Sequence, residues 1–382
     1  MRIAMFTETY LPTRDGVVTS VLTTKRTLEE MGHEVYIFAP EPADEKDKES
    51  GVFYFKSISF RKYPSYRIAP FPSDKCRILR ELDVDLIHSH GLFYMALRSM
   101  FAARSLKKPV VISFHTMVTD AARYFLQIPI PENVINRLAW IYLRELLERA
   151  NAVVVPSHAI LEELKQKAPT MKRVEVIPTG IDCSKFNPTL DGFFVRKKYG
   201  VEKNRIVLHL GRISWEKNID LVLRGFSILA SKYDDVVLMI VGDGPARSYY
   251  MKQADDLRIA DRVIFTGFVP DDEIPLHYAA CDAFITASKF ETQGLVILEA
   301  MACGKPVAGI NYRAVAEIIG KENPSCLFEE DPVSCANAIE NALNCKEENR
   351  ALIRNRATQF SAKDSARKLC RLYDELIKEM NE

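Results

Sequence analysis

The sequence predicts an α/β protein of two domains, each built on a parallel β-sheet with helices on both faces. The 382-residue chain is too long for one ordinary core and suits two units of this kind. In both halves, short Val- and Ile-rich runs alternate with helical patterns, as buried parallel strands and their connecting helices do. A turn-rich segment, 178–188, lies between the halves, and we expect the hinge there.

The first half repeats a strand–helix–strand rhythm. It opens with a short apolar run, a polar loop and a helical pattern that Gly32 ends. Residues 41–50 carry mixed charge and are expected to form a solvated loop. We expect strands at 3–6, 35–39, 86–88, 110–114 and 152–156, with helices at 17–31, 92–103 and 131–149.

The second half starts the same pattern again, and it ends in a charged helix, 362–382, that no strand follows. We expect strands at 206–210, 236–241, 263–266, 283–286 and 306–310, with a helix at 219–232. In parallel sheets, ligands bind on the loops that leave the carboxyl ends of the strands. We therefore expect the two sheets to face each other across a cleft lined by such loops. These loops follow Phe6, Phe114, Leu210, Val241, Thr266 and Thr286.

The composition excludes several classes of protein. The formal net charge is +1, which gives no global reason to expect nucleic-acid binding. No apolar run approaches the ~20 residues of a membrane-spanning helix, and Glu8 interrupts the first run before a signal-peptide core forms. We expect a cytoplasmic protein, peripheral on a membrane at most. The eight cysteines include no C-x-x-C pair and are expected to be reduced thiols.

Two short motifs suggest metal ligands, but we expect no metal site. Asp83-Val-Asp85 spells D-x-D, yet it precedes a strand and so lies at the wrong end of the sheet. His88-Ser-His90 has alternate spacing and no third ligand nearby in the sequence.

The sharpest candidate site lies in the segment 290–307. Glu291 follows a strand and is expected to accept hydrogen bonds from sugar hydroxyls. Thr292, Gln293, Gly294 and Leu295 then open a helix, whose free N–H groups suit an oxygen-rich ligand. Glu299, about two helical turns deeper, is expected to reach ribose hydroxyls of the same ligand.

Two further loops of the second half point to a diphosphate. Arg212 and Lys217 follow the strand 206–210, and together they would neutralise a departing nucleoside diphosphate. Gly242-Asp-Gly-Pro245 lacks the third glycine of the dinucleotide fingerprint, but its Gly242 suits a loop that receives the nucleotide base.

In the first half, three residues on loops are candidates. Gly16 lies after the first strand, where its backbone could approach the donor phosphates. His115 follows the strand 110–114 and could bind a sugar hydroxyl or stabilise positive charge at the reacting carbon. Asp120 could orient the acceptor.

These residues resemble glycosyltransferase family 4, the retaining enzymes of the GT-B fold. The resemblance covers nearly the whole chain and rests on the Gly16 and His115 loops, the text Ile177-Pro-Thr-Gly-Ile-Asp182, the Arg212–Lys217 pair and the E-x7-E helix. It implies a UDP- or GDP-sugar donor, no metal or other cofactor, retention of configuration by front-face attack, and a last helix that crosses back to the first domain. Many members have two glycines in the first loop, whereas Val17 follows Gly16 here.

The resemblance also divides the chain by role. Residues 1–180 with 362–382 are expected to form the acceptor-binding domain, and residues 181–361 the domain that binds the nucleotide-sugar donor.

The acceptor is expected to be a lipid. Ser288-Lys-Phe-Glu-Thr-Gln-Gly294, His115-Thr-Met117 and Arg67-Ile-Ala-Pro-Phe-Pro72 resemble the subgroup that glucosylates diacylglycerol. The region 56–108 holds eleven basic residues against four acidic ones, interleaved with aromatic residues that suit an anionic membrane surface. The basic residues are Lys56, Arg61, Lys62, Arg67, Lys75, Arg77, Arg80, Arg98, Arg104, Lys107 and Lys108.

Other interpretations stay open at this point. The same fold and donor chemistry would serve a soluble acceptor such as a sugar, a sugar phosphate or an inositol phosphate. A nucleotide-sugar epimerase or a phosphorylase would share only the fold. A non-enzymatic regulator that binds a nucleotide sugar is a further alternative. The sequence does not indicate the oligomeric state.

Overall fold

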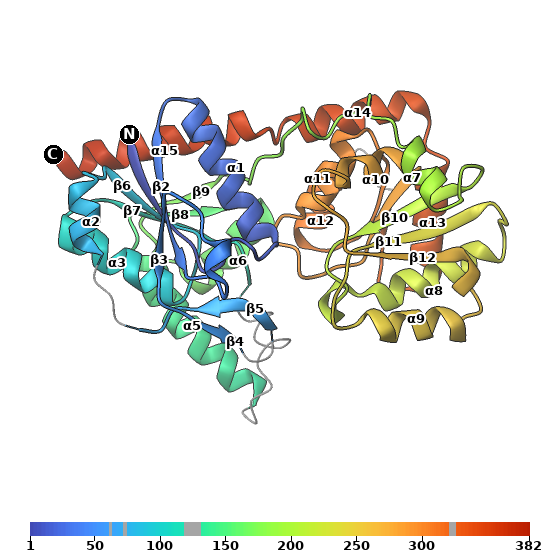
Figure 1. The fold of residues 1–382 in the computed structure, drawn as a ribbon, viewed down its shortest axis with the longest axis horizontal. Coiled ribbons are helices and arrows are strands. Elements are labelled where there is room, and N and C mark those ends of the chain that lie inside the picture. Colours follow the sequence, from blue (N-terminus) through green and yellow to red (C-terminus); the bar gives the residue numbers. More distant parts are fainter. Residues whose placement is uncertain (61–62, 72–74, 118–130, 321–325) are drawn as a thin grey trace. The chain divides into compact units, whose positions relative to one another are not determined.

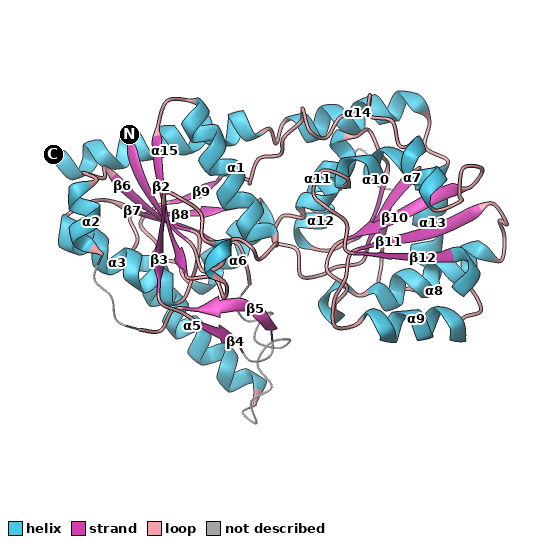
Figure 2. Ribbon diagram, viewed as in Figure 1, coloured by secondary structure: helices cyan, strands magenta, loops and turns pink. Residues whose placement is uncertain are grey.

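The computed structural model of the chain describes residues 1–60, 63–71, 75–117, 131–320 and 326–382. These residues form two compact units, Met1–Gly180 with Ala362–Glu382 and Ile181–Ser361 (Figure 1). Each unit holds one parallel sheet with helices around it (Figure 2), which confirms the predicted α/β class.

The sheet of the first unit has seven strands, all parallel. In spatial order they are β3 (Val52–Phe55), β2 (Glu34–Pro40), β1 (Arg2–Phe6), β6 (Leu86–Ser89), β7 (Val110–Ser113), β8 (Ala152–Val155) and β9 (Val174–Val176).

The two faces of this sheet follow from the alternation of side chains along each strand. Ile3 and Met5 of β1 pack against one group of helices, while Ala4 and Phe6 pack against the other. The first group is α1 (Gly16–Glu30) and α15 (Ala362–Asn381). The second face is covered by α2 (Cys76–Glu81), α3 (Tyr94–Leu106), α5 (Glu132–Arg149) and α6 (His158–Lys167).

The last helix, α15, returns to the first unit, as predicted. Its apolar residues Leu369, Tyr373 and Leu376 are buried in the same cluster as Ile3 and Met5. A strongly amphipathic sequence at the chain end therefore completes a core that the first strand began.

Short strands at the edges of both sheets are absent from the sequence-based prediction. β3 and β9 lie at the two edges of the first sheet, and a two-stranded antiparallel hairpin, β4 (Ile58–Phe60) with β5 (Tyr63–Ile68), stands beside it. The predicted loop 41–50 contains a single 3-10 turn, η1 (Glu45–Asp47). Edge strands of this length carry too few residues to show a period in the sequence.

The sheet of the second unit has six parallel strands. In spatial order they are β12 (Val263–Gly267), β11 (Val236–Val241), β10 (Arg205–Leu210), β13 (Ala283–Thr286), β14 (Val307–Ile310) and β15 (Leu327–Phe328). The helices are α7 (Phe193–Lys198), α8 (Ile219–Ala230), α9 (Arg247–Asp256), α10 (Ile274–Ala280), α11 (Leu295–Ala302), α12 (Arg313–Ile319), α13 (Pro332–Leu343) and α14 (Glu347–Thr358), with 3-10 turns η2 (Trp215–Lys217) and η3 (Ala260–Arg262).

A close approach of two helices fixes the core of this unit. A Cβ atom at Gly225 of α8 would lie 2.6 Å from Sγ of Cys335 on α13, so a larger residue would push the helices apart. Cys335 is buried, and all eight cysteines are free thiols, as predicted.

Both sheets reverse their strand order at one point. The chain moves outward from β1 to β3 and then returns to place β6 beside β1; in the second unit it moves from β10 to β12 and returns to place β13 beside β10. At such a reversal the loops leaving the two central strands diverge and leave room for a ligand. The loops after β1 and β6, and after β10 and β13, are therefore the places to look for a site.

Candidate active site

The reversal point of the second sheet brings two predicted residues into direct contact. Lys217, on the loop after β10, donates from Nζ to Oε1 of Glu291, on the loop after β13, over 2.6 Å. Their side chains are 21% and 16% exposed, so the ion pair is largely shielded from water. Shielded charges interact more strongly than exposed ones, and the pair therefore fixes both loops.

The surroundings of Glu291 keep its carboxyl group ionised. Burial alone would raise its pKa, but Lys217, the Ser288 hydroxyl and His209 act in the opposite direction, so the pKa lies below its ordinary value. His209, on β10, has its Nδ1 within 3.1 Å of the carbonyl oxygen of Ile285, and burial lowers its pKa to about 4. Glu291 is therefore a fixed negative charge beside a neutral histidine.

Arg212 is held by a buried carboxylate. Its guanidinium donates to Oε1 of Glu216 over 2.9 Å, and the Ser214 hydroxyl donates to the same oxygen over 2.6 Å. The side chain of Glu216 is 1% exposed, whereas that of Arg212 is 31% exposed. The arginine thus has a rigid base and a partly accessible guanidinium, which suits recognition of an anion.

The backbone around Gly294 opens a helix end. Gly294 has a φ of +86°, in the left-handed region that favours glycine, and α11 begins at the next residue, Leu295, without a side-chain cap. Thr292 and Gln293 are buried just before it, and Leu295 is half-buried. An uncapped helix start offers its first N–H groups to an anionic ligand.

Glu299 lies on α11 and has a protein partner. The hydroxyl of Tyr278, on α10, donates to its Oε2 over 2.9 Å. Burial raises the pKa of Glu299 to about 7, and the Tyr278 hydroxyl and the charge of Lys185 oppose that rise. Glu299 therefore titrates near neutral pH in the ligand-free protein.

Three glycines lie together where β10, β11 and β12 end. Gly211, Gly242 and Gly267 have φ values of +149°, +132° and +75°, and the N–H of Gly242 donates to the carbonyl of Gly267. A Cβ at Gly242 would lie 2.0 Å from the carbonyl oxygen of Gly211. Side chains are excluded here by the backbone itself, so a flat group such as a nucleobase can approach the chain closely.

In the first unit, Gly16 is the first residue of α1. The carboxylate of Asp15 caps this helix and accepts from the N–H groups of Val17 and Val18, both over 2.9 Å. The first-turn donors after Gly16 are thus already engaged, which reduces what a phosphate could use there. A Cβ at Gly16 would meet nothing within 4 Å, so the backbone of this residue is open on that side.

His115 follows β7 and is half-buried. Its Nε2 lies 2.9 Å from Nδ1 of His90, which is buried on the loop after β6. Burial lowers the pKa of His115 to about 4, so the ring is neutral at physiological pH. Asp120, predicted to orient the acceptor, lies outside the described residues.

Comparisons with known proteins identify the family of the chain. A family model described as Glycosyltransferase Family 4 matches residues 14–185, and one described as Glycosyl transferases group 1 matches residues 193–359. The alpha-monoglucosyldiacylglycerol synthase of Streptococcus pneumoniae is 33% identical over 99% of this chain and 86% of its own length. The chain is a family 4 glycosyltransferase.

One further relative and one solved structure extend the comparison. The alpha-monoglucosyldiacylglycerol synthase of Acholeplasma laidlawii is 28% identical over 86% of this chain and 84% of its own length. The crystal structure of Anabaena HepE in complex with UDP-glucose has a TM-score of 0.77 at 20% identity, covering 98% of this chain and all of that one. This likeness shows the shared GT-B fold.

Sequence reasoning misses two residues that shape the first unit of the glycosyltransferase. Glu8, on the loop after β1, accepts from the N–H groups of Phe93 and Met95 and so caps the start of α3. A Cβ at Gly91 would lie 2.3 Å from Cγ of Glu8. In the sequence, His90 stands out only as one of two histidines that could bind a metal. Its alternate spacing with His88 does indicate that both rings lie on one side of the strand end.

The two discounted metal motifs have structural partners. Asp85 accepts from the backbone N–H of Arg2 over 2.7 Å, and the Arg2 guanidinium forms an ion pair with Asp83 over 2.5 Å, both at the amino end of the sheet. Both ring nitrogens of His88 lie within hydrogen-bond distance of hydroxyl groups, those of Tyr373 and Ser113. Within the residues that the structure describes, no cluster of three metal-ligating side chains occurs.

The region 56–108 is less uniformly basic on the surface than its sequence suggests. Arg67 donates to the carbonyl oxygens of Glu41 and Ser57, and Arg98 donates to those of Ala69 and Phe71, so these two bases stabilise loops. The exposed apolar and aromatic side chains of the first unit include Phe71, Phe93, Tyr94, Leu97 and Phe101, together with Val134, Leu138 and Ile141 on α5.

No helix in the described ranges has both the length and the apolar character needed to cross a membrane. The α5 residues Val134, Leu138 and Ile141 recur at helical spacing and form one exposed stripe. This stripe is not predictable from the sequence, because helical spacing alone does not tell which side of a helix is covered.

Proposed function

We propose that this enzyme transfers glucose from UDP-glucose to the hydroxyl group of a diacylglycerol-type lipid, with retention of configuration and without a metal. The observation that carries the proposal is the relative from Streptococcus pneumoniae, which matches nearly the whole chain at 33% identity and is named for this product class. The relative from Acholeplasma laidlawii carries the same name. HepE, which shares the fold, binds UDP-glucose.

The second unit is proposed to hold the donor. Arg212 and Lys217 would grip the diphosphate, and the uncapped start of α11 at residues 292–295 would supply N–H groups to the same anion. Glu299 would accept hydrogen bonds from the ribose hydroxyls. Gly242 lies with Gly211 and Gly267 at the strand ends, where the nucleotide base could approach the backbone.

Glu291 is proposed to bind the transferred sugar. Its carboxylate is ionised and anchored by Lys217, so it can accept hydrogen bonds from sugar hydroxyls without moving. Because Lys217 would contact both Glu291 and the phosphate, one cation would set the distance between the sugar site and the leaving group.

The chemical step is proposed to be a front-face substitution. The acceptor hydroxyl oxygen bonds to the anomeric carbon on the face from which the phosphate oxygen departs, and that phosphate oxygen takes the hydroxyl proton. Arg212 and Lys217 neutralise the charge that develops on the leaving diphosphate, a role that a divalent cation fills in other enzymes.

The first unit is proposed to bind the acceptor. Gly16 would bring the start of α1 to the donor phosphates, and neutral His115 would bind the sugar or stabilise charge at the anomeric carbon. Asp120 would orient the acceptor hydroxyl.

Access to a lipid is proposed to come from peripheral attachment to an anionic membrane. The exposed residues Leu97 and Phe101 on α3 flank a pocket of about 270 Å³ that also includes Lys75 and Arg98. Apolar side chains near cations suit the interface between acyl chains and anionic headgroups.

A donor-panel assay in EDTA, with and without diacylglycerol-containing anionic liposomes, tests the proposal. We expect glucose transfer from UDP-glucose that survives EDTA and requires the liposomes, with an α-linked product. Leu97→Ser with Phe101→Ser should reduce liposome sedimentation while UDP binding is unchanged. If the rate of donor turnover is the same with and without liposomes, a soluble acceptor is favoured. Loss of activity in EDTA would contradict the metal-free mechanism.

A further inference from the structure

A line of buried and half-buried polar side chains that includes three histidines runs through the first unit. It begins on α15, where the Tyr373 hydroxyl lies 2.6 Å from Nδ1 of His88, and the Nε2 of His88 lies 2.8 Å from the Ser113 hydroxyl. The ring of His90 lies beside it, with centroids 4.1 Å apart, and His90 in turn contacts His115. Burying polar groups costs free energy unless they are hydrogen-bonded, so a functional reason for these residues is expected.

His90 has one hydrogen-bonded nitrogen and one without a partner. Its Nδ1 lies 2.9 Å from Nε2 of His115, and the two rings are nearly parallel, at 11°. Its Nε2 is buried and has no hydrogen-bond partner among the residues that the structure describes. The backbone N–H of His90 donates to the carbonyl of Phe6 over 2.7 Å, and this hydrogen bond fixes the backbone of His90 at the end of β1.

Both rings are neutral, because burial lowers the pKa of His115 to about 4 and that of His90 well below its ordinary value. A neutral imidazole carries one proton, on either Nδ1 or Nε2. The contact between the rings therefore has two possible arrangements. Either His90 donates from Nδ1 to a bare Nε2 of His115, or His115 donates from Nε2 to a bare Nδ1 of His90.

The unpartnered nitrogen of His90 decides between them. If His90 accepts from His115, its single proton sits on the buried Nε2, and an N–H group is left without an acceptor. If His90 donates, the buried Nε2 carries only a lone pair. Buried N–H groups without partners are rarer than under-used acceptors, so the arrangement in which His90 donates costs less.

We propose that His90 is a positioning residue that donates to His115 and so fixes the proton of His115 on Nδ1. The tautomer of a histidine is set by the hydrogen bond that one of its nitrogens makes. His115 then presents a donor, and not an acceptor, at its second nitrogen. Such a group can donate to a sugar hydroxyl oxygen or to a phosphate oxygen, but it cannot remove a proton from the acceptor.

This inference rests on the role proposed for His115, and it adds the direction of the hydrogen bond that this residue can make. It also explains the spacing of His88 and His90. The first ring is braced by two hydroxyl groups, and the second packs on it and reaches the neighbouring loop.

The direct test is the tautomer of His115 in the wild-type enzyme. The chain has seven histidines, so selective ¹⁵N labelling of histidine gives few ring signals, and His115→Ala and His90→Phe assign the two of interest. We expect the signals of a neutral Nδ1–H ring for His115 from pH 6 to 8. A neutral Nε2–H ring in the wild type would overturn the proposal without any variant having to fold.

Kinetics test the consequence. His90→Phe keeps an aromatic ring but removes the donor, and it should lower kcat by roughly 10- to 100-fold, the scale of a misplaced catalytic group, with a much smaller change in KM for the donor sugar. His90→Asn places an amide N–H near the position of Nδ1 and should recover most of kcat. Tyr373→Phe is the matched control, because it removes a hydrogen bond to His88 and leaves His90 and His115 unaltered; it should lower the Tm without lowering kcat at a permissive temperature.

A double-substitution cycle separates the two ways in which the inference can fail. His90→Phe should have no further effect on the rate in a His115→Ala background, because His90 acts only through His115. A rate loss in His115→Ala with wild-type kcat in His90→Phe would overturn the positioning role alone. Full transfer activity in His115→Ala would overturn the proposed role of His115 itself, whatever His90 does.

Discussion

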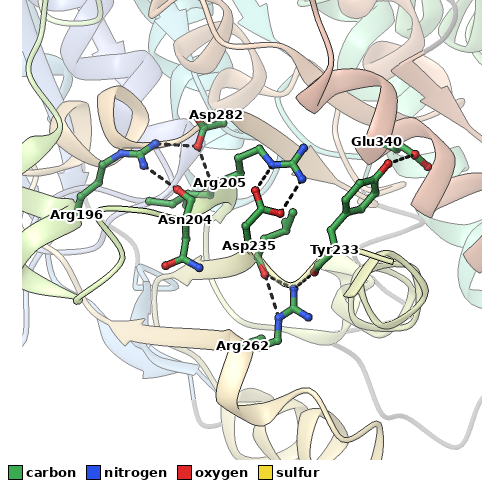
Figure 3. Close-up of polar contacts among 10 residues, drawn as sticks. Arg196, Asn204, Arg205, Tyr233, Asp235, Arg262, Asp282 and Glu340 are labelled. Atoms are coloured by element: carbon green, nitrogen blue, oxygen red, sulfur yellow. Dashed lines mark hydrogen bonds and ion pairs between the residues drawn. The ribbon is translucent and has the colours of Figure 1, made fainter. Parts of the chain in front are cut away.

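At the amino end of the second sheet, Arg205 binds Asp235 through two hydrogen bonds, whereas at the carboxyl end Arg212 shares Glu216 with the Ser214 hydroxyl (Figure 3 shows the amino end). Both arginine side chains are 31% exposed, so neither burial nor residue type distinguishes them. The difference lies in what surrounds each pair.

Charges at the amino end also hold the backbone. Asp282 accepts from Arg196 and from the N–H of Ile206 (Figure 3), and Arg262 donates to the carbonyl oxygens of Ala230, Tyr233 and Val236. These groups close the turns that enter the strands. Asp282 and Arg262 each form hydrogen bonds with the protein's own backbone, so their role is in folding.

Charges at the carboxyl end stand beside glycines and an uncapped helix. Lys217 and Glu291 bind each other, close to the left-handed Gly294 and the start of α11. Removing a charge here should therefore impair ligand binding and catalysis more than folding, whereas the reverse should hold at the amino end. This contrast can be tested with matched pairs of substitutions.

The largest effect is expected for Glu291. Glu291→Gln removes the charge that Lys217 anchors and should reduce transfer by about 10²–10³-fold, the scale of a lost electrostatic contact in a transition state. Asp282→Asn is the control, because Asp282 precedes β13 whereas Glu291 follows it, and its partner Arg196 is 21% exposed, as Lys217 is. It should cost roughly 1–3 kcal/mol in the free energy of unfolding and leave kcat near wild type.

Transfer rates and denaturant melts of both variants check this prediction. Equal losses of activity in the two variants, measured on folded protein, would show that the carboxyl end has no special role.

A smaller effect is expected for the arginines. Arg212→Met should weaken UDP binding by about 1.5–3 kcal/mol, roughly 10- to 150-fold, because a charge-assisted hydrogen bond to phosphate is lost. Arg205→Met should lower the Tm without changing UDP affinity, since Arg205 binds Asp235 and the face of Tyr233 at the opposite end of the sheet. Calorimetric titration with UDP measures both, and unchanged affinity in Arg212→Met would remove that residue from the phosphate site.

The sequence predicts much of this site because parallel strands and their loops follow a regular order. The strands ending at Leu210 and Thr286 are enough to place Arg212, Lys217 and Glu291 on loops at one edge of the sheet. Their contact is not predictable in the same way. Lys217 and Glu291 are 74 residues apart, and only the placement of β13 beside β10 brings them together.

The hydrogen-bond partners of the site residues are not predictable from the hydrophobic periodicity of the sequence. Tyr278 reaches Glu299 from the short helix α10, and His115 reaches His90 from the neighbouring strand. Gly16 stays a prediction: the sequence places its backbone at the donor phosphates, and the structure adds that Asp15 accepts from two of the N–H groups that follow. Side-chain caps of this kind depend on local geometry as well as on residue type.

The smallest effect is expected at Glu299, which belongs to the carboxyl end but is bound by a protein hydroxyl. Burial raises its pKa from 4.5 to about 7, so the folded protein favours the protonated form. Well below pH 4.5 the carboxyl group is neutral in both the folded and the unfolded chain, so it does not lower the free energy of unfolding. As the pH rises from 4.5 to 7, the unfolded chain ionises more readily, and the folded state loses stability relative to it.

Glu299→Gln removes this titration. The variant should therefore gain stability over the wild type as the pH rises from about 5 to 7, with a constant difference above about pH 7.5. If ribose hydroxyls donate to the carboxylate, UDP affinity of the wild type should also rise between about pH 6 and 8, and that of Glu299→Gln should not. Melting curves and UDP titrations across this range measure both. Parallel pH profiles for the two proteins would mean that Glu299 titrates outside this window and that its burial does not hold it in the protonated form.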